Sequence, residues 1–241
     1  MAEDDRLRSA ELSSLASGEV PKRYARNIGT LGVEGQRRLL ETGVLVAGLG
    51  GLGGFVLESL ARLGVGRIAG VDRDVFDETN LNRQLLSDHK TLGLSKAEAA
   101  RERILRVNPA VEFTAYSSPF QALGPEAFRG LSAVFDCLDD IPSRRELSAR
   151  CADAGVVLIH GAIAGWCGQV AVCPPGKGIL EDIYAAAKSP RGAEVEAGNL
   201  PMTAAVAANL MVAAAVPVLL GRPAEPRLQL FDLSDPSWSR A

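Results

Sequence analysis

The sequence contains few cysteines, and it has no excess of positive charge. Only four of its 241 residues are cysteine, at positions 137, 151, 167 and 173, and no two of them form a C-x-x-C pair. Because structural zinc sites commonly use such pairs, we predict that the chain holds no zinc. Basic residues number 26 against 29 acidic residues, which gives a formal net charge of −3. A nucleic-acid-binding surface is therefore not expected.

We also expect neither a signal peptide nor a membrane span. Residues 1–5 are too acidic to begin a signal peptide, and sparse cysteines fit a reducing compartment, so we expect a cytoplasmic protein. The run Thr203–Leu220 has the length of a membrane helix. Its composition is dominated by alanine and includes Asn209 and Pro217, which favours a buried helix.

An apolar strand at residues 44–47 leads straight into a glycine-rich turn. Gly48, Gly50 and Gly53 fit the pattern G-x-G-x-x-G. In this pattern glycines allow a tight turn and let backbone N–H groups approach a phosphate at the start of a helix. The next residues, Phe55–Leu63, have the apolar spacing of a helix, and Gly64 ends it. The pattern predicts a nucleotide site that includes all three glycines.

A second apolar strand, Arg67–Val71, ends at Asp72. An acidic side chain about 20 residues past such a turn reaches the ribose hydroxyls of a bound nucleotide. A nicotinamide-dependent oxidoreductase would begin in the same way. This part of the sequence therefore indicates a nucleotide without saying which one.

The residues after Asp72 narrow the choice of nucleotide. Arg83 and Gln84 follow it closely, and Lys96 begins a predicted helix, Lys96–Val107. A cation at a helix start opposes the helix dipole and is not expected for stability. Hydride transfer seldom needs a cluster of cations close behind the ribose site. The set therefore indicates a ligand that supplies negative charge.

Alternating strands and helices predict an α/β fold. We expect a Rossmann-like, mostly parallel sheet with helices on both faces. Two later strands, Gly168–Val172 and Arg227–Phe231, are expected to be antiparallel, and a crossover loop lies between them at about 174–200. A loop of this length in a compact domain is usually functional.

The expected domain organisation is simple. Residues 1–20 are predicted to form an N-terminal helical arm with a helix at Leu7–Leu15, and residues 21–241 a single domain. A further short helix is predicted at Gln36–Leu40.

Seven segments of the chain carry a resemblance to a known family. They are RYARNIGTLGVEGQRRL at 23–39, VLVAGLGGLGG at 44–54, VDRD at 71–74, NLNRQ at 80–84, GLSK at 93–96, NP at 108–109 and DCLDD at 136–140. In order and spacing they resemble the ThiF/MoeB/HesA family of ubiquitin-activating-enzyme-like adenylyltransferases. The resemblance covers most of the chain and is densest between residues 23 and 144.

The resemblance implies an ATP-dependent adenylyltransferase. In this family the C-terminal glycine carboxylate of a small ubiquitin-like sulfur carrier ending in Gly-Gly attacks the α-phosphate of ATP, which releases pyrophosphate and leaves an acyl-adenylate. Both reactants are anions, and one unit charge pair near 4 Å is worth on the order of 4 kcal/mol at an effective dielectric of 20. Cations must therefore be placed around the phosphates in advance.

The resemblance also implies roles for particular residues. Asp72 matches the ribose-binding acid, and Asp139 matches the carboxylate that coordinates Mg²⁺. Arg26 matches an arginine that reaches into the partner subunit's ATP site, which implies a homodimer. Expected nucleotide contacts are Gly48, Gly50, Gly51, Gly53, Asp72, Asn80, Arg83, Gln84 and Lys96, and the expected catalytic residues are Arg26, Arg83, Lys96 and Asp139.

The chain departs from the family pattern at several positions. Many relatives hold zinc with two C-x-x-C pairs, and those that form a thioester or persulfide place a cysteine in the crossover loop. Residues 174–200 contain no cysteine, and Glu194 stands near that position. We therefore expect the chain to stop at the adenylate and to hand it to a separate sulfur-transfer protein. Asp140 replaces the asparagine usual after the magnesium-binding aspartate.

Five further residues have weaker or no assignments. Arg144 matches a family arginine near the carrier, with a helix-surface charge as the alternative. Trp166 and Tyr184 are candidates for the path of the carrier's tail, with a core position as the alternative. His89 and His160 belong to no motif and receive no role.

Three other functions stay open from the sequence alone. They are an NAD-dependent Rossmann oxidoreductase, a non-catalytic nucleotide-binding subunit, and a ThiF-like dehydratase that modifies transfer RNA. The presence of Arg26, Arg83, Lys96 and Asp139 together argues against the non-catalytic subunit. The sequence does not identify the carrier, whose pathway could be thiamine, molybdenum cofactor, cysteine or specialised-metabolite synthesis.

Overall fold

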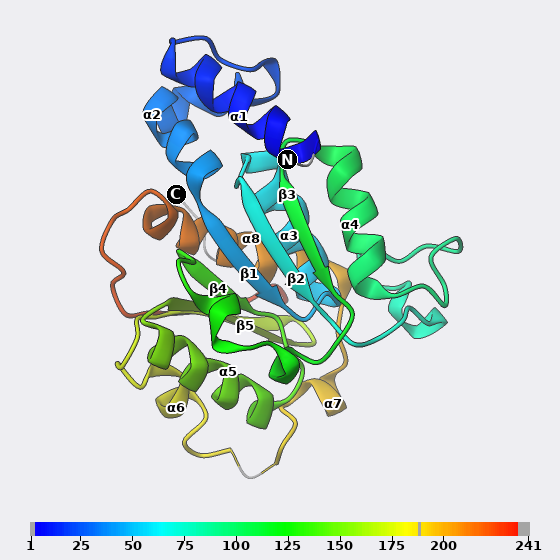
Figure 1. The fold of residues 1–241 in the computed structure, drawn as a ribbon. Helices are drawn as coiled ribbons and strands as arrows, with labels where there is room; N and C mark the ends of the chain where they lie inside the picture. Colours follow the sequence, from blue (N-terminus) through cyan, green and yellow to red (C-terminus); the bar gives the residue numbers. More distant parts are fainter. Residues whose placement is uncertain (1–2, 188, 236–241) are drawn as a thin grey trace.

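A computed structural model describes residues 3–187 and 189–235 of the chain. Seven strands form one sheet in the order β3-β2-β1-β4-β5-β6-β7 (Figure 1). They are β1 (Gly43–Ala47), β2 (Arg67–Val71), β3 (Glu112–Tyr116), β4 (Ala133–Asp136), β5 (Val157–Ala164), β6 (Cys167–Cys173) and β7 (Arg227–Asp232). β1 to β5 pair in parallel, whereas β6 and β7 are antiparallel to their neighbours. The predicted fold class is confirmed.

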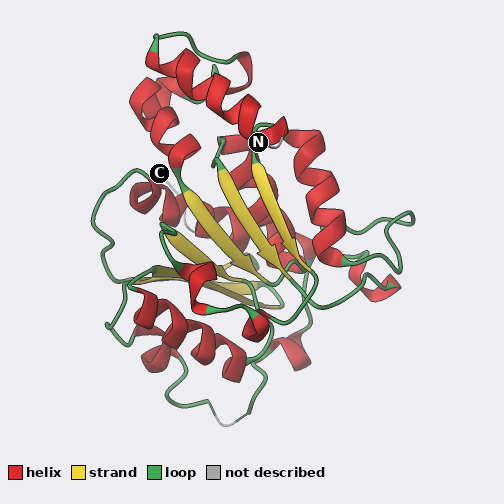
Figure 2. Ribbon diagram, in the orientation of Figure 1, coloured by secondary structure: helices red, strands yellow, loops and turns green. Residues whose placement is uncertain are grey.

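Helices cover both faces of the sheet (Figure 2). The helices are α1 (Glu3–Ala16), α2 (Ile28–Glu41), α3 (Gly51–Leu63), α4 (Lys96–Val107), α5 (Ile141–Ala154), α6 (Ile179–Ile183), α7 (Glu194–Ala197) and α8 (Pro201–Leu219). α3, α4 and α8 share one apolar core with one face of the sheet, and α5 and α6 share a second core with the other. Every residue of β1 and β4 is buried, as expected for central strands covered on both sides.

Three helices differ in extent from the sequence-based prediction. α3 begins at Gly51 instead of Phe55, because the glycine turn itself forms the first turn of the helix. α2 is much longer than the predicted Gln36–Leu40 and is interrupted at Gly32, whose φ is 67°. α1 likewise extends the predicted helix at both ends.

The long apolar run near the C-terminus forms α8. Its buried side, which includes Ala204, Ala208 and Met211, packs against α3, β5 and β6. By length and composition alone this helix could also cross a membrane, and 44% of its apolar stretch is buried. Its contacts with the sheet are those of a core helix.

The helix α1 packs against α2. Leu15 of α1 forms a small apolar cluster with Tyr24 and Leu40. The Tyr24 hydroxyl donates to Glu11 at 2.8 Å and accepts from Asn108 at 3.0 Å. These bonds anchor the segment that carries Arg26. The division into an arm at 1–20 and a domain at 21–241 stays a prediction.

The start of α3 lies very close to the turn after β1. A Cβ atom on Gly53 would lie 1.9 Å from the carbonyl oxygen of Gly48. Gly48 itself has a φ of 87°, in the left-handed region that favours glycine. Together the two glycines let the helix begin directly at the end of the strand, so that its N-terminus opens at the edge of the sheet.

We predict that Gly53→Ala lowers the free energy of unfolding by about 3 kcal/mol, because the methyl group meets backbone that cannot move aside. Urea unfolding followed by circular dichroism measures the change. Gly29→Ala is the control, since a Cβ there meets nothing within 4 Å. Equal unfolding midpoints for the two variants would contradict this packing role.

Candidate active site

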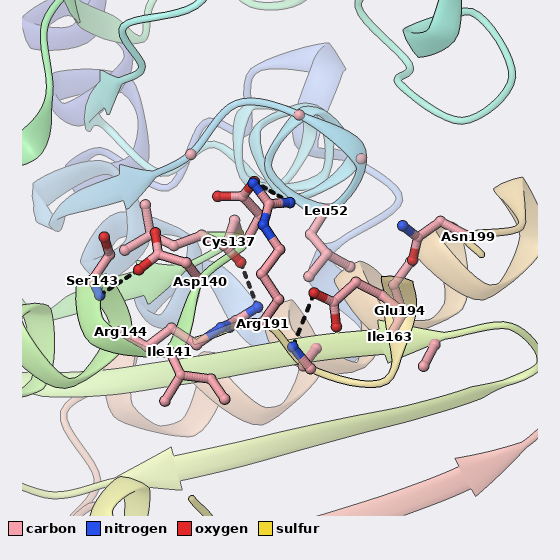
Figure 3. A pocket seen from close by; sticks show the side chains of 18 of the residues that line it. Leu52, Cys137, Asp140, Ile141, Ser143, Arg144, Ile163, Arg191, Glu194 and Asn199 are labelled. Carbon is pink, nitrogen blue, oxygen red and sulfur yellow. Dashed lines mark hydrogen bonds and ion pairs between the residues drawn. The ribbon is translucent and has the colours of Figure 1, made fainter. Parts of the chain in front are cut away.

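A cavity of about 1250 Å³ lies where the loops after β1, β2 and β4 meet (Figure 3). β1 has β2 as its neighbour on one side and β4 on the other, so the direction of the strand order reverses at β1. Ligands of open α/β sheets bind at such a reversal. Nine of the residues expected from the sequence line the cavity: Gly48, Gly50, Gly51, Asp72, Asn80, Arg83, Gln84, Lys96 and Asp139. The structure thus gathers them around one space, and their individual roles stay predictions.

Backbone groups hold the Asp72 carboxylate in place. One of its oxygens accepts from the Leu49 N–H at 2.7 Å, and the other from the Asp74 N–H at 2.9 Å. The first bond ties the end of β2 to the glycine turn, so the carboxylate lies near the N-terminus of α3. This place suits an acid that binds a ribose whose phosphates approach the helix end.

The side chain of Gln84 is buried beside the glycine turn. Its Oε1 atom has no hydrogen-bond partner among the residues that the structure describes. A buried polar atom without a partner is uncommon in native proteins. Gln84 lines the cavity, and a Cβ on Gly50 would lie 3.4 Å from its amide nitrogen. The amide is therefore placed to bond to a ligand that covers the turn.

A reciprocal cap fixes the loop that carries Asn80 and Gln84. The Asp77 carboxylate accepts from the Thr79 N–H at 2.7 Å, and the Asn80 side-chain oxygen accepts from the Asp77 N–H at 3.3 Å. Hydrogen bonds from Thr79 lower the pKa of Asp77, which keeps the cap ionised. The polar string after β2 is thus held rigidly at the cavity wall.

Lys96 and Arg83 are among the cations that line the cavity from this side. Lys96 is buried at the start of α4, with Nζ 3.3 Å from Asp74 Oδ2. Arg83 donates through Nη1 to the carbonyl of Thr79 at 2.9 Å and to Asn82 Oδ1 at 2.8 Å. Because these Arg83 partners are uncharged, they orient its guanidinium without neutralising it.

Asp139 lies in the loop between β4 and α5, with an exposed carboxylate. Within residues 3–187 and 189–235, no three His, Cys, Asp or Glu side chains come together as a metal site. One carboxylate still fits Mg²⁺, which often takes one or two protein carboxylates together with phosphates and water. The adjacent Asp140 accepts from the Ser143 N–H at 2.8 Å and caps α5, which asparagine at this position could also do.

A buried charge network lies beneath the Asp139 loop. Asp136 Oδ2 lies 3.1 Å from Arg144 Nη1 and 2.7 Å from His160 Nδ1. Burial opposes ionisation of Asp136, but the Arg144 charge and the His160 hydrogen bond outweigh it and lower its pKa. Burial lowers the pKa of His160, so the ring is neutral at pH 7. Arg144 is thus a buried ion-pair partner, and its interpretation as a helix-surface charge is wrong.

The network reaches the cavity through two further side chains. Tyr184 Oη and Gln169 Nε2 lie 3.2 Å and 3.1 Å from His160 Nε2, and both residues line the cavity. A neutral ring that donates from Nδ1 to Asp136 accepts at Nε2 from these groups. His160, which belongs to no sequence motif, therefore connects the core to the cavity wall.

Some expected residues lie elsewhere. Arg26 is exposed, and neither it nor Gly53 lines the cavity of this chain. Trp166 is also exposed and outside the cavity lining. The cavity continues along the antiparallel strands β6 and β7, where Gln169, Leu230 and Phe231 line it. Leu230 is 69% exposed on the edge strand β7 and extends this apolar wall to the surface.

Comparison with known proteins gives consistent matches. Residues 24–241 match the ThiF family. The chain is 35% identical to the molybdopterin-synthase adenylyltransferase of Salmonella typhimurium, with 87% of each chain covered. It is also 35% identical to the sulfur carrier protein adenylyltransferase of Thermus thermophilus, over 90% of this chain and 85% of that protein.

Two further matches are less complete or more distant. The probable adenylyltransferase/sulfurtransferase MoeZ of Mycobacterium tuberculosis is 34% identical over 88% of this chain, which spans only 56% of that protein. The crystal structure of Escherichia coli MccB with ATP is similar with a TM-score of 0.70 at 18% identity, over 97% of this chain and 80% of that one. At that identity the likeness concerns the fold.

The buried histidine predicts a pH-dependent stability. In the unfolded chain an imidazole takes up a proton below about pH 6.5, whereas folded His160 resists protonation, so stability is full above this pH and falls as the pH is lowered. For one proton the slope is at most about 1.4 kcal/mol per pH unit. We expect urea unfolding of His160→Gln between pH 7 and pH 5 to show a smaller slope than that of the parent chain.

The second histidine of the chain supplies the control. His89 is exposed, and His89→Gln is expected to keep the pH dependence of the parent chain. If His160→Gln kept the parent slope as well, the buried network would not be the source of the acid sensitivity.

Proposed function

The chain belongs to the ThiF family, and from that premise we propose that it is an ATP-dependent adenylyltransferase that activates the C-terminal glycine carboxylate of a small ubiquitin-like sulfur carrier. Two relatives at 35% identity are named adenylyltransferases, one of molybdopterin synthase and one of a sulfur carrier protein. Both match this chain over most of their own length, which supports a shared activity.

One observation of the structure carries the proposal. A single cavity joins the glycine turn and Asp72, which suit a nucleoside and its phosphates, to Arg83 and Lys96, which suit the negative charge of a triphosphate, and to Asp139, which suits a magnesium ion bound to it. A nicotinamide site needs the first group and seldom the second. The unpartnered Oε1 atom of Gln84 points to a ligand that covers the same turn.

The proposed reaction follows from this arrangement. A carboxylate oxygen of the carrier attacks the α-phosphorus, the bond from that phosphorus to the bridging oxygen breaks, and pyrophosphate leaves with the electron pair. Asp72 holds the ribose, and the N-terminus of α3 faces the phosphates. Arg83 and Lys96 offset the repulsion between the two anions. Mg²⁺ held by Asp139 would add positive charge at the phosphates.

The carrier's tail is proposed to enter along β6 and β7. Gln169, Leu230 and Phe231 line that end of the cavity, and an extended tail requires both apolar contact and hydrogen-bond partners. Cys167 also lies there, but partial desolvation and the Asp232 carboxylate raise its pKa. A thiolate is thus disfavoured, which supports transfer of the adenylate to a separate sulfur-transfer protein.

A homodimer in the cytoplasm completes the proposal. Arg26 is exposed, and Tyr24, two residues before it, is bonded into the core. An arginine on such an anchored segment is available to a second subunit. We propose that it reaches the partner's triphosphate.

Exchange of labelled pyrophosphate into ATP, with a carrier ending in Gly-Gly, tests the activity. We expect Arg83→Ala and Lys96→Ala each to slow exchange by about 10²-fold, judged by the loss of single charge-stabilising donors in other enzymes. Asp139→Ala should abolish the dependence of the rate on magnesium concentration. Arg106→Ala removes an exposed charge from the same helix as Lys96 and should leave the rate unchanged.

Two results would contradict the proposed function. The first is the parental exchange rate in all three cavity variants. The second is tight NAD binding without ATP binding in the parent chain. Activity on transfer RNA without any response to the carrier would instead favour the dehydratase alternative.

The proposed dimer predicts complementation between inactive subunits. Arg26→Ala and Lys96→Ala each damage every site of their own homodimer. A mixed dimer holds one site with both side chains intact, because Arg26 would come from one subunit and Lys96 from the other. Partial unfolding and refolding of the two variants together should therefore restore part of the exchange activity. If mixed dimers form and the mixture stays inactive, Arg26 does not act in the partner's site.

A further inference from the structure

The guanidinium of Arg191 extends into the cavity from the segment between β6 and α8 (Figure 3). Its Nη1 atom lies 3.5 Å from Asp139 Oδ2. We propose that Arg191 is an additional triphosphate-binding residue, which exchanges its contact with Asp139 for contacts with the phosphates when magnesium and ATP bind. This inference rests on the proposed adenylyltransferase function and adds a cation that the sequence motifs do not include.

The segment that carries Arg191 is docked onto the same loop as Asp139. The carbonyl of Pro190 accepts from the N–H of Ile141, the first residue of α5, at 2.8 Å. On the other side of Arg191, the Gly192 N–H donates to Glu194 at 3.1 Å. The first bond places the Arg191 backbone beside the start of α5, and the second orders the segment just after it, so the side chain reaches the cavity directly.

The ion pair with Asp139 is suited to exchange. The Arg191 and Asp139 side chains are 57% and 75% exposed, and pairs of this kind contribute little to stability in water. A magnesium ion that binds the Asp139 carboxylate displaces the guanidinium from it. Arg191 is then free beside a triphosphate, whose oxygens suit the planar, bidentate donor geometry of arginine.

Arg144 and Lys96, two other cations that line the cavity, are less free to move. Arg144 is committed to Asp136 and to the carbonyl of Gly161 at 2.8 Å. Lys96 is buried beside Asp74. Arg191 can therefore follow the charge of the phosphates in a way that these two residues cannot.

The ion pair between Arg191 and Asp139 could also mean that Arg191 hinders nucleotide binding. If Arg191 only blocks Asp139, it competes with magnesium, and its removal tightens the binding of the metal–nucleotide complex. If Arg191 binds the phosphates, its removal weakens that binding. The two cases thus differ in the sign of one equilibrium measurement.

Isothermal titration calorimetry with ATP and magnesium, without any carrier protein, measures this sign because no turnover occurs. We expect Arg191→Ala to raise the dissociation constant of ATP about tenfold, the loss of one charge-assisted contact. AMP lacks the outer phosphates, so its affinity should be unchanged. Arg191→Lys keeps the charge but not the bidentate donor geometry, so its dissociation constant for ATP should lie between those of the parent chain and Arg191→Ala.

Lys177→Ala is the matched control. It removes one exposed positive charge from the same β6–α8 segment at a place outside the cavity lining, and its ATP affinity should equal that of the parent chain. Unchanged or tighter ATP binding in Arg191→Ala would overturn the inference and leave the proposed function standing. Failure of the parent chain to bind ATP would instead remove the proposed function on which the inference rests.

Discussion

The proposed reaction depends on positive charge held where two anions must meet. A carboxylate and a triphosphate repel each other, and water would screen them only if the site stayed open. The fold places the N-terminus of α3, Arg83 and Lys96 around one cavity at the carboxyl edge of the sheet. The close approach of Gly53 to Gly48 makes this possible, because it starts the helix directly at the end of β1.

The buried network controls a second part of the site. Asp136 accepts from the N–H of Leu138 at 3.1 Å, and Arg144 donates to the carbonyl of the same residue. Leu138 is therefore held from both sides, and the next residue is Asp139. Since removing one member of a buried ion pair leaves an unpaired charge, Asp136 and Arg144 are mutually dependent. Through His160 the same network supports Tyr184 and Gln169 on the far wall.

Local patterns predicted the strand–turn–helix–strand unit and the cavity residues after it, because glycine spacing, apolar runs and Asp72 all lie within a short stretch of chain. The network was not predictable in this way. Asp136 and His160 meet because they are register partners in the parallel pair of β4 and β5, and no local pattern encodes register. Arg191 was missed for a related reason, since its contact with Asp139 joins segments 52 residues apart. The available signal for the network was a polar, titratable residue within an otherwise apolar strand, namely His160 in β5.

The most direct test is a crystal structure with magnesium and a non-hydrolysable ATP analogue. We expect the ribose to contact Asp72, the metal to lie on Asp139, and the phosphates to lie between the start of α3 and the side chains of Arg83 and Lys96. A nucleotide bound elsewhere, or phosphates that face solvent while Arg83 and Lys96 keep only their protein partners, would contradict this expectation.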